Sequence, residues 1–153
     1  MLYTESHRVF LYIVKHCISS VKLRVTILYS MEINQITHEI IDSAYKVHSA
    51  LGPGLLESSY QACLVYEIRQ RGLHVETEVA LPLVYEEIKL DCGYRIDILV
   101  ERQVVIELKV VEALNDVHLA QILTYVKFAN KRIGLLINFN VKSLKDGIRR
   151  VVL

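Results

Sequence analysis

The sequence GYRIDILVERQVVIELKV, residues 93–110, holds two apolar runs joined by a short polar segment. Each run, 93–100 and 104–110, predicts a strand, because aliphatic and β-branched side chains dominate both. Side chains alternate between the two faces of a strand, so Glu107 and Lys109 point to the same face. The second strand therefore carries an acid and a base side by side within an otherwise apolar run. Charges in such a run are costly unless they are paired or bind a metal.

The first strand carries a further acid, Asp97. By alternation, Asp97 shares a face with Arg95 and Leu99, and the opposite face takes Ile96, Ile98 and Val100.

The length of the hairpin loop decides whether Asp97 meets Glu107. A two-residue loop over 101–102 places Asp97 opposite Ile106 and puts the two acids on opposite faces. A three-residue loop over 101–103 places Asp97 directly opposite Glu107, with their Cβ atoms roughly 4.5–5.5 Å apart. We expect the odd-length loop, or a compensating bulge.

Two carboxylates at this separation repel each other unless a proton or a cation lies between them. A hard divalent ion, Mg²⁺ or Mn²⁺, suits oxygen ligands of this kind. Lys109 would orient or deprotonate a water on the ion, or stabilise charge on a phosphate. The residues alone equally allow a strand-to-strand salt bridge among Asp97, Glu107 and Lys109 at a sheet edge.

The remaining pattern predicts helices around a mixed sheet. Apolar positions at helical spacing and strand-like runs alternate along the chain, with helices over 36–51, 55–72 and 115–129 and strands over 74–80, 81–85, 132–139 and 147–153. Asn115 or Asp116 caps the third helix. This order predicts the α/β class, an α+β mixed sheet with helices packed against it. We expect residues 1–30 to be an N-terminal extension and residues 31–153 to be the domain.

Composition excludes several classes of protein. The chain has 153 residues and a net charge of +1, so a nucleic-acid surface would have to be local, in the first thirty residues or over 127–150. Solvated faces explain the same basic residues equally well. Three cysteines without CxxC spacing argue against disulfides and a zinc site and favour the cytoplasm. No run reaches about 18 apolar residues, so no membrane span is expected.

At Asp97 and the Glu107-Leu108-Lys109 element, the sequence resembles the PD-(D/E)XK nuclease superfamily. The run GLLESSY, residues 54–60, looks like the motif of the GxxExxY protein family within that superfamily. The run QILTY, residues 121–125, looks like the QxxxY helix of its exonuclease-like branch. The resemblance extends over about 33–153, including GLLINFN and LKDG near the end.

The resemblance implies a restriction-endonuclease-like core, with helices followed by a β-meander, a helix and a further strand. It implies that Asp97 and Glu107 bind Mg²⁺ or Mn²⁺, that Glu57 approaches the metal from a helix, and that Lys109 is catalytic. The Leu108 carbonyl would be an extra ligand. Its family motif comprises Gly54, Glu57 and Tyr60, and Gln121 and Tyr125 would line the site with Glu57 and Lys109 as catalytic residues.

Helical spacing agrees with these roles, because Glu57 shares a face with Tyr60, and Gln121 with Tyr125. Simpler interpretations exist for each residue taken alone. Glu57 suits the first turn of a helix through the helix dipole. A tyrosine at either position suits core packing with a satisfied hydroxyl. His118, on the side of Gln121, suits a surface or capping role, and we leave it out of the metal site.

Together with these residues, the resemblance implies a Mg²⁺-dependent nuclease that hydrolyses phosphodiester bonds of nucleic acid, with DNA favoured over RNA. The alternative is a non-catalytic module on the same fold that binds nucleic acid or protein, since a fold does not determine a function. A bare core of this size also suggests a homodimer or a partner protein.

Overall fold

The computed structural model describes residues 33–90 and 93–153. The predicted extension, residues 1–30, lies outside the described residues. Residues 36–153 form one compact unit. The predicted boundary between residues 30 and 31 therefore stays a prediction.

The fold is the predicted mixed α/β arrangement. Residues 33–51 are helical. The elements that follow are α2 (Glu57–Gln70), β1 (Val75–Ala80), β2 (Leu83–Tyr85), β3 (Ile88–Leu90), β4 (Arg95–Val100), β5 (Val104–Lys109), α3 (Asp116–Phe128), β6 (Ile133–Asn138), α4 (Leu144–Gly147) and β7 (Ile148–Val152). The sequence pattern did not predict β3 or α4, which are only three and four residues long.

Five strands form one sheet in the order β1-β4-β5-β6-β7, and β2 pairs with β3 in a separate hairpin. Only the β5–β6 pair is parallel in this sheet. The chain crosses from β5 to β6 through α3, as a parallel pair requires. The result is consistent with the restriction-endonuclease-like core that the resemblance implies.

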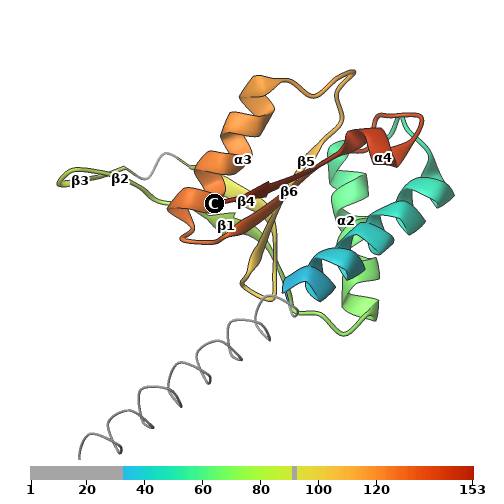
Figure 1. Ribbon diagram of the computed structural model, residues 1–153, viewed down its shortest axis with the longest axis horizontal. Helices are drawn as coiled ribbons and strands as arrows, with labels where there is room; N and C mark the ends of the chain where they lie inside the picture. Colours follow the sequence, from blue (N-terminus) through green and yellow to red (C-terminus); the bar gives the residue numbers. More distant parts are fainter. Residues whose placement is uncertain (1–32, 91–92) are drawn as a thin grey trace, which may run out of the picture. The chain divides into compact units, whose positions relative to one another are not determined.

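Helices cover both faces of the sheet (Figure 1). Helix α2 contacts β1, β4 and β5, whereas α3 contacts β5, β6 and β7. Strand β6 allows α3 to approach closely at Gly134, where an added Cβ would lie 2.6 Å from a Val126 methyl carbon. Strand β5 is buried along almost its whole length, because it lies at the centre of the sheet with a helix on each side.

The ladder between β1 and β4 is interrupted where Glu78 faces Asp97. Pairs are regular from Val75–Val100 to Thr77–Ile98 and resume at Val79–Ile96. Glu78 has a φ of 51°, in the left-handed region.

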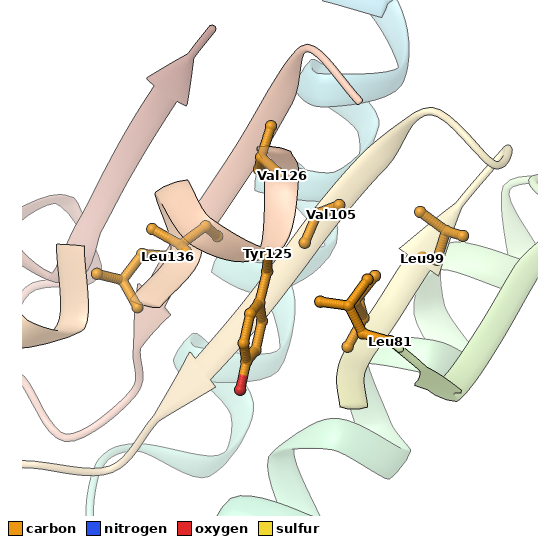
Figure 2. Close-up of a cluster of buried hydrophobic side chains, with 8 residues drawn as sticks. Leu81, Leu99, Val105, Tyr125, Val126 and Leu136 are labelled. Carbon is orange, nitrogen blue, oxygen red and sulfur yellow. The ribbon is translucent and has the colours of Figure 1, made fainter. Parts of the chain in front are cut away.

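The faces predicted for β4 are wrong at Ile96. Ile96 packs in the same buried cluster as Leu99 and Val105 instead of sharing a face with Ile98. Figure 2 shows Leu99 and Val105 of this cluster with Tyr125 and Val126 of α3. The positive φ at the break in the β1–β4 ladder belongs to Glu78 on β1, and the strict alternation predicted for β4 does not hold at Ile96.

None of the helices within residues 33–90 and 93–153 has the length and hydrophobicity that crossing a membrane requires.

Candidate metal centre

The hairpin between β4 and β5 has the predicted three-residue loop. Val100 pairs with Val104 and Ile98 with Ile106, so the loop consists of residues 101–103. Continuing this register by one residue sets Asp97 opposite Glu107. Both Glu101 and Arg102 adopt a positive φ, of 50° and 52°, which is how so short a loop reverses the chain. The sequence prediction of an odd-length loop is confirmed.

Glu107 is a buried carboxylate with one oxygen bound and the other without a partner. Only 2% of the residue is exposed. Its Oε1 accepts a hydrogen bond from Lys109 Nζ at 2.6 Å, while the buried Oε2 has no hydrogen-bond partner. Burial raises the pKa of Glu107 to about 7, helped by the charge of Asp97 and opposed by the hydrogen bond from Lys109.

Lys109 is the base that pairs with this carboxylate. Burial alone would lower its pKa, but the hydrogen bond and charge of Glu107, with the charges of Glu57 and Asp97, outweigh burial and raise the pKa above its ordinary value. Lys109 therefore remains a cation at neutral pH. Of the salt bridge among Asp97, Glu107 and Lys109 that the sequence allowed at a sheet edge, the Lys109–Glu107 pair is present, on the central strand β5. This pair leaves Glu107 Oε2 without a partner.

Asp97 is held by the backbone of the neighbouring strand. Leu108 N donates to Asp97 Oδ2 at 2.8 Å. Burial raises the pKa of Asp97, against the opposing effects of the Leu108 N–H and the Lys109 charge. The hydrogen bond from Leu108 N fixes the Asp97 carboxylate beside β5.

Gln61 is a residue that the sequence analysis missed. Its Nε2 donates to the Asp97 carbonyl oxygen at 3.0 Å and to Glu78 Oε1 at 2.9 Å. The amide therefore bridges the two residues at which the β1–β4 ladder is interrupted. A signal was present in the sequence, since Gln61 lies four residues after Glu57 and so on the same helix face.

Glu57 opens α2 and is exposed. Its charge contributes to the raised pKa values of Asp97, Glu107 and Lys109. No three acidic, histidine or cysteine side chains of the described residues converge tightly enough to form a metal cluster by themselves. Glu57 therefore acts on the centre through its charge in this structure, and its role as a ligand stays a prediction.

Tyr60 and Gly54 shape the turn that leads into α2. Tyr60 is fully buried, its hydroxyl donates to Gly52 O at 2.6 Å and accepts from Leu55 N at 3.2 Å. Its ring stacks on Phe139 with centroids 4.5 Å apart. Gly54 has a φ of 103°, which a residue with a side chain rarely adopts. The interpretation of Tyr60 as a core residue with a satisfied hydroxyl is confirmed.

Helix α3 carries the QxxxY pair. Asn115 caps this helix, and His118 Nδ1 accepts from Asn115 N, so the capping role of His118 is confirmed. Gln121 Nε2 donates to the Tyr125 hydroxyl at 3.0 Å. The Tyr125 ring packs beside Val105, and Figure 2 shows its hydroxyl directed along β5 toward the end of that strand. Within residues 33–90 and 93–153, no hydrogen bond joins this pair to the acids of the centre.

Asn138 is a second residue that the sequence analysis missed. It is fully buried at the end of β6. Its Oδ1 accepts from Val111 N, and its Nδ2 donates to Val111 O at 2.8 Å. These bonds hold the chain just after Lys109. An amide inside the apolar run 132–139 was the available signal.

The residues present fit a hard divalent cation. The Glu107 Oε2 is a buried oxygen without a partner, and such an oxygen is costly unless it meets a donor or a cation. A second carboxylate, Asp97, lies close enough for its charge to raise the pKa of Glu107. Carboxylate oxygens are the ligands that Mg²⁺ and Mn²⁺ prefer. The structure thus brings Asp97, Glu107 and Lys109 together.

Comparison with known proteins agrees with this geometry. The model of the PD-(D/E)XK nuclease superfamily matches residues 34–151, which is most of the chain. No curated protein and no solved structure matches the chain. The narrower resemblance to the GxxExxY family stays a prediction.

Proposed function

We propose that this chain, which belongs to the PD-(D/E)XK nuclease superfamily, is a divalent-metal-dependent nuclease that hydrolyses phosphodiester bonds of nucleic acid. One observation carries the proposal. The Glu107 carboxylate is buried beside Asp97 with one oxygen bound to Lys109 and the other without a partner. A cation that neutralises both acids would stabilise such a buried carboxylate most.

Asp97 and Glu107 would hold the ion, Mg²⁺ or Mn²⁺, and Glu57 would approach it from the start of α2. A bound ion of this type would polarise a phosphoryl oxygen and activate a water as the nucleophile. General acid–base assistance contributes only about 10²–10⁴-fold, so lysine alone is inadequate for a phosphodiester.

The chain's own residues supply position and charge. Leu108 N and Gln61 fix Asp97 from its side chain and its backbone, and Glu107 fixes Lys109. Lys109 is a cation with a preset direction, so it would donate to a phosphate oxygen and stabilise the charge that develops there. Gln121 and Tyr125 would border the bound strand from α3.

The test is cleavage of end-labelled DNA and RNA with Mg²⁺ or Mn²⁺ added to the metal-free full chain. We expect the wild type to cut, with DNA cut in preference, and Glu107→Ala or Lys109→Ala to abolish cutting. The matched control is Glu112→Ala, an exposed acid just past β5 that should leave the rate unchanged. Equal cleavage by the wild type and the Glu107 and Lys109 variants would refute the proposal.

A non-catalytic module gives a different result in the same experiment. Such a module would bind nucleic acid with an affinity that does not depend on the metal, and it would cut neither substrate. Circular dichroism of each variant establishes that a lost activity does not reflect a lost fold.

A further inference from the structure

We infer that the hollow between α3 and the base of the β2–β3 hairpin binds one unpaired nucleobase, so that the substrate is a single strand or a frayed end. The inference rests on the proposed nuclease function and narrows its substrate class. We call this hollow the α3 pocket. It encloses about 220 Å³ and is lined by Leu81, Leu83, Tyr94, Thr124, Tyr125 and Phe128.

The α3 pocket has the composition of a stacking site. Three of its six lining residues are aromatic, and none is charged. Its volume lies below the roughly 300–1,000 Å³ of pockets for drug-sized ligands, which suits a single heterocycle. Proteins that bind single strands stack bases on aromatic side chains, and every base offers a π face for this contact.

Two of the aromatic rings are accessible at the rim of the pocket. Tyr94 is 47% exposed and Phe128 is 42% exposed. Tyr94 meets Tyr125 edge on, with ring centroids 6.3 Å apart and planes inclined by 60°. Large aromatic surface is normally buried, so two accessible rings around one concave site indicate a ligand surface.

Tyr125 connects the α3 pocket to the metal centre. Its ring lines the pocket and also packs in the cluster that contains Ile96 and Val105 (Figure 2). Ile96 adjoins Asp97, and Val105 lies two residues before Glu107 on the same face of β5. A strand rises about 3.3 Å per residue, so Val105 and Glu107 are about 7 Å apart along β5. A base in the pocket and a phosphate at the centre can therefore belong to one short stretch of a strand.

The distribution of charge decides which part of a nucleotide enters. A phosphate has no cation to meet in the uncharged pocket, whereas Lys109 and a bound metal attract it at the centre. A neutral flat base gains from the aromatic walls instead. Bases stacked inside a duplex cannot reach such a pocket without being unpaired, and unpairing is least costly for a single strand or an end.

The β2–β3 hairpin offers a competing occupant. Tyr85 and Ile88 pair near its tip and are 64% and 56% exposed, so a second copy of the chain could place this apolar surface in the pocket. The hairpin turn, however, carries two adjacent acids, Glu86 and Glu87, with no cation in the pocket lining to receive them. We therefore favour the base and treat self-association as an outcome of the test.

The experiment measures binding without cleavage, in EDTA, by fluorescence anisotropy. The probes are a labelled oligothymidylate, the same sugar–phosphate chain with abasic residues, and a blunt duplex. We expect Tyr94→Leu and Phe128→Leu to weaken oligothymidylate binding about 5- to 150-fold, the equivalent of one lost stacking contact. Binding of the abasic chain and of the duplex should stay unchanged.

The matched control is Tyr66→Leu, which removes a ring that is 60% exposed on α2, away from the pocket. Two separate pocket variants guard against one of them misfolding, and thermal unfolding checks both. Equal affinity of wild type and pocket variants for oligothymidylate would overturn the inference, as would an equal loss for the abasic chain or no binding by the wild type. A pocket variant that dissociates a dimer and leaves oligothymidylate affinity unchanged would also overturn it.

The outcomes separate this inference from the nuclease proposal. Base-dependent binding by a chain that does not cut with any metal would retain the pocket and refute the nuclease. Metal-dependent cutting with an intact affinity in Tyr94→Leu and Phe128→Leu would retain the nuclease and refute the pocket.

Discussion

The last residue of each of the two family motifs is a tyrosine, Tyr60 on α2 and Tyr125 on α3. The two tyrosines have different surroundings. On α2, Tyr60 is fully buried and its hydroxyl binds the backbone at Gly52 and Leu55. On α3, the hydroxyl of Tyr125 accepts from the side chain of Gln121, and its ring lines an open pocket.

The difference indicates that Tyr60 stabilises the fold, whereas Tyr125 also lines a candidate binding surface. The Tyr60 hydroxyl binds the turn that leads into α2, where Glu57 lies, and its ring is fully buried. Loss of Tyr60 should therefore lower the free energy of unfolding. The Tyr125 hydroxyl binds a side chain that can find a new partner in water, so loss of that hydroxyl alone should change the stability little. Four measurements test this comparison and the metal centre, from the largest expected effect to the smallest.

The largest effect is expected for Tyr60→Ala. Removing a fully buried aromatic ring leaves a cavity against Phe139 and should lower the free energy of unfolding by about 3–5 kcal/mol. Urea denaturation of the full chain measures it, with Tyr66→Ala as the exposed control that should change it by less than about 0.5 kcal/mol. A loss below about 1 kcal/mol would contradict the structural role of Tyr60.

The next effect is the gain in the free energy of unfolding from metal bound at the candidate centre on β4 and β5. Mn²⁺ at one hundred times its Kd should stabilise the chain by about 2.7 kcal/mol, because only the folded chain assembles the site. Glu107→Gln keeps the shape of the side chain but removes the charge, so it should abolish the gain. Thermal unfolding with and without Mn²⁺ measures it, and a gain of the same size in the variant would show that the ion binds elsewhere.

A smaller effect is expected for Gln61→Ala on α2. The variant loses the hydrogen bond to the Asp97 carbonyl, which is worth about 1 kcal/mol. It should also weaken Mn²⁺ binding, because Asp97 is no longer held at the break in the ladder. Isothermal titration reads the metal affinity, and Gln70→Ala on the same helix is the control. An unchanged Mn²⁺ affinity would limit Gln61 to a structural role.

The smallest change in stability is expected for Tyr125→Phe. It should lower the free energy of unfolding by at most about 0.5 kcal/mol, since Gln121 is only partly buried and its amide can bind water instead. The matched variant Tyr60→Phe strips two backbone partners and should cost more. A larger loss for Tyr125→Phe than for Tyr60→Phe in parallel urea denaturations would reverse the comparison.

Local patterns predicted much of this molecule. Alternation in residues 104–110 placed Glu107 and Lys109 on one face, and the spacing of Asp97 from Glu107 required the odd-length loop that the register confirms. The caps of α3 followed from Asn115 and its neighbours. Each of these features depends on residues close together in the chain, which is why one-dimensional patterns capture them.

Features that depend on residues far apart in the chain could not be predicted from the sequence. The face predicted for Ile96 is wrong, at a place where the β1–β4 ladder is interrupted and Gln61 of α2 binds both Glu78 and the Asp97 carbonyl. The short strand β3 is too brief to leave a period in the sequence. The hydrogen bonds between the Asn138 side chain and the Val111 backbone likewise join the ends of β5 and β6, which only the parallel pairing of these strands brings together.

The sequence by itself determined which residues carry the charges of the centre and that they alternate onto one face, because side-chain direction in a strand follows from covalent geometry. Only the tertiary structure decided the state of those charges. Helices on both faces of β5 remove Glu107 from water, Lys109 satisfies one of its oxygens, and the other is left without a partner. Desolvation depends on everything packed around a group, so it appears only when the chain has folded.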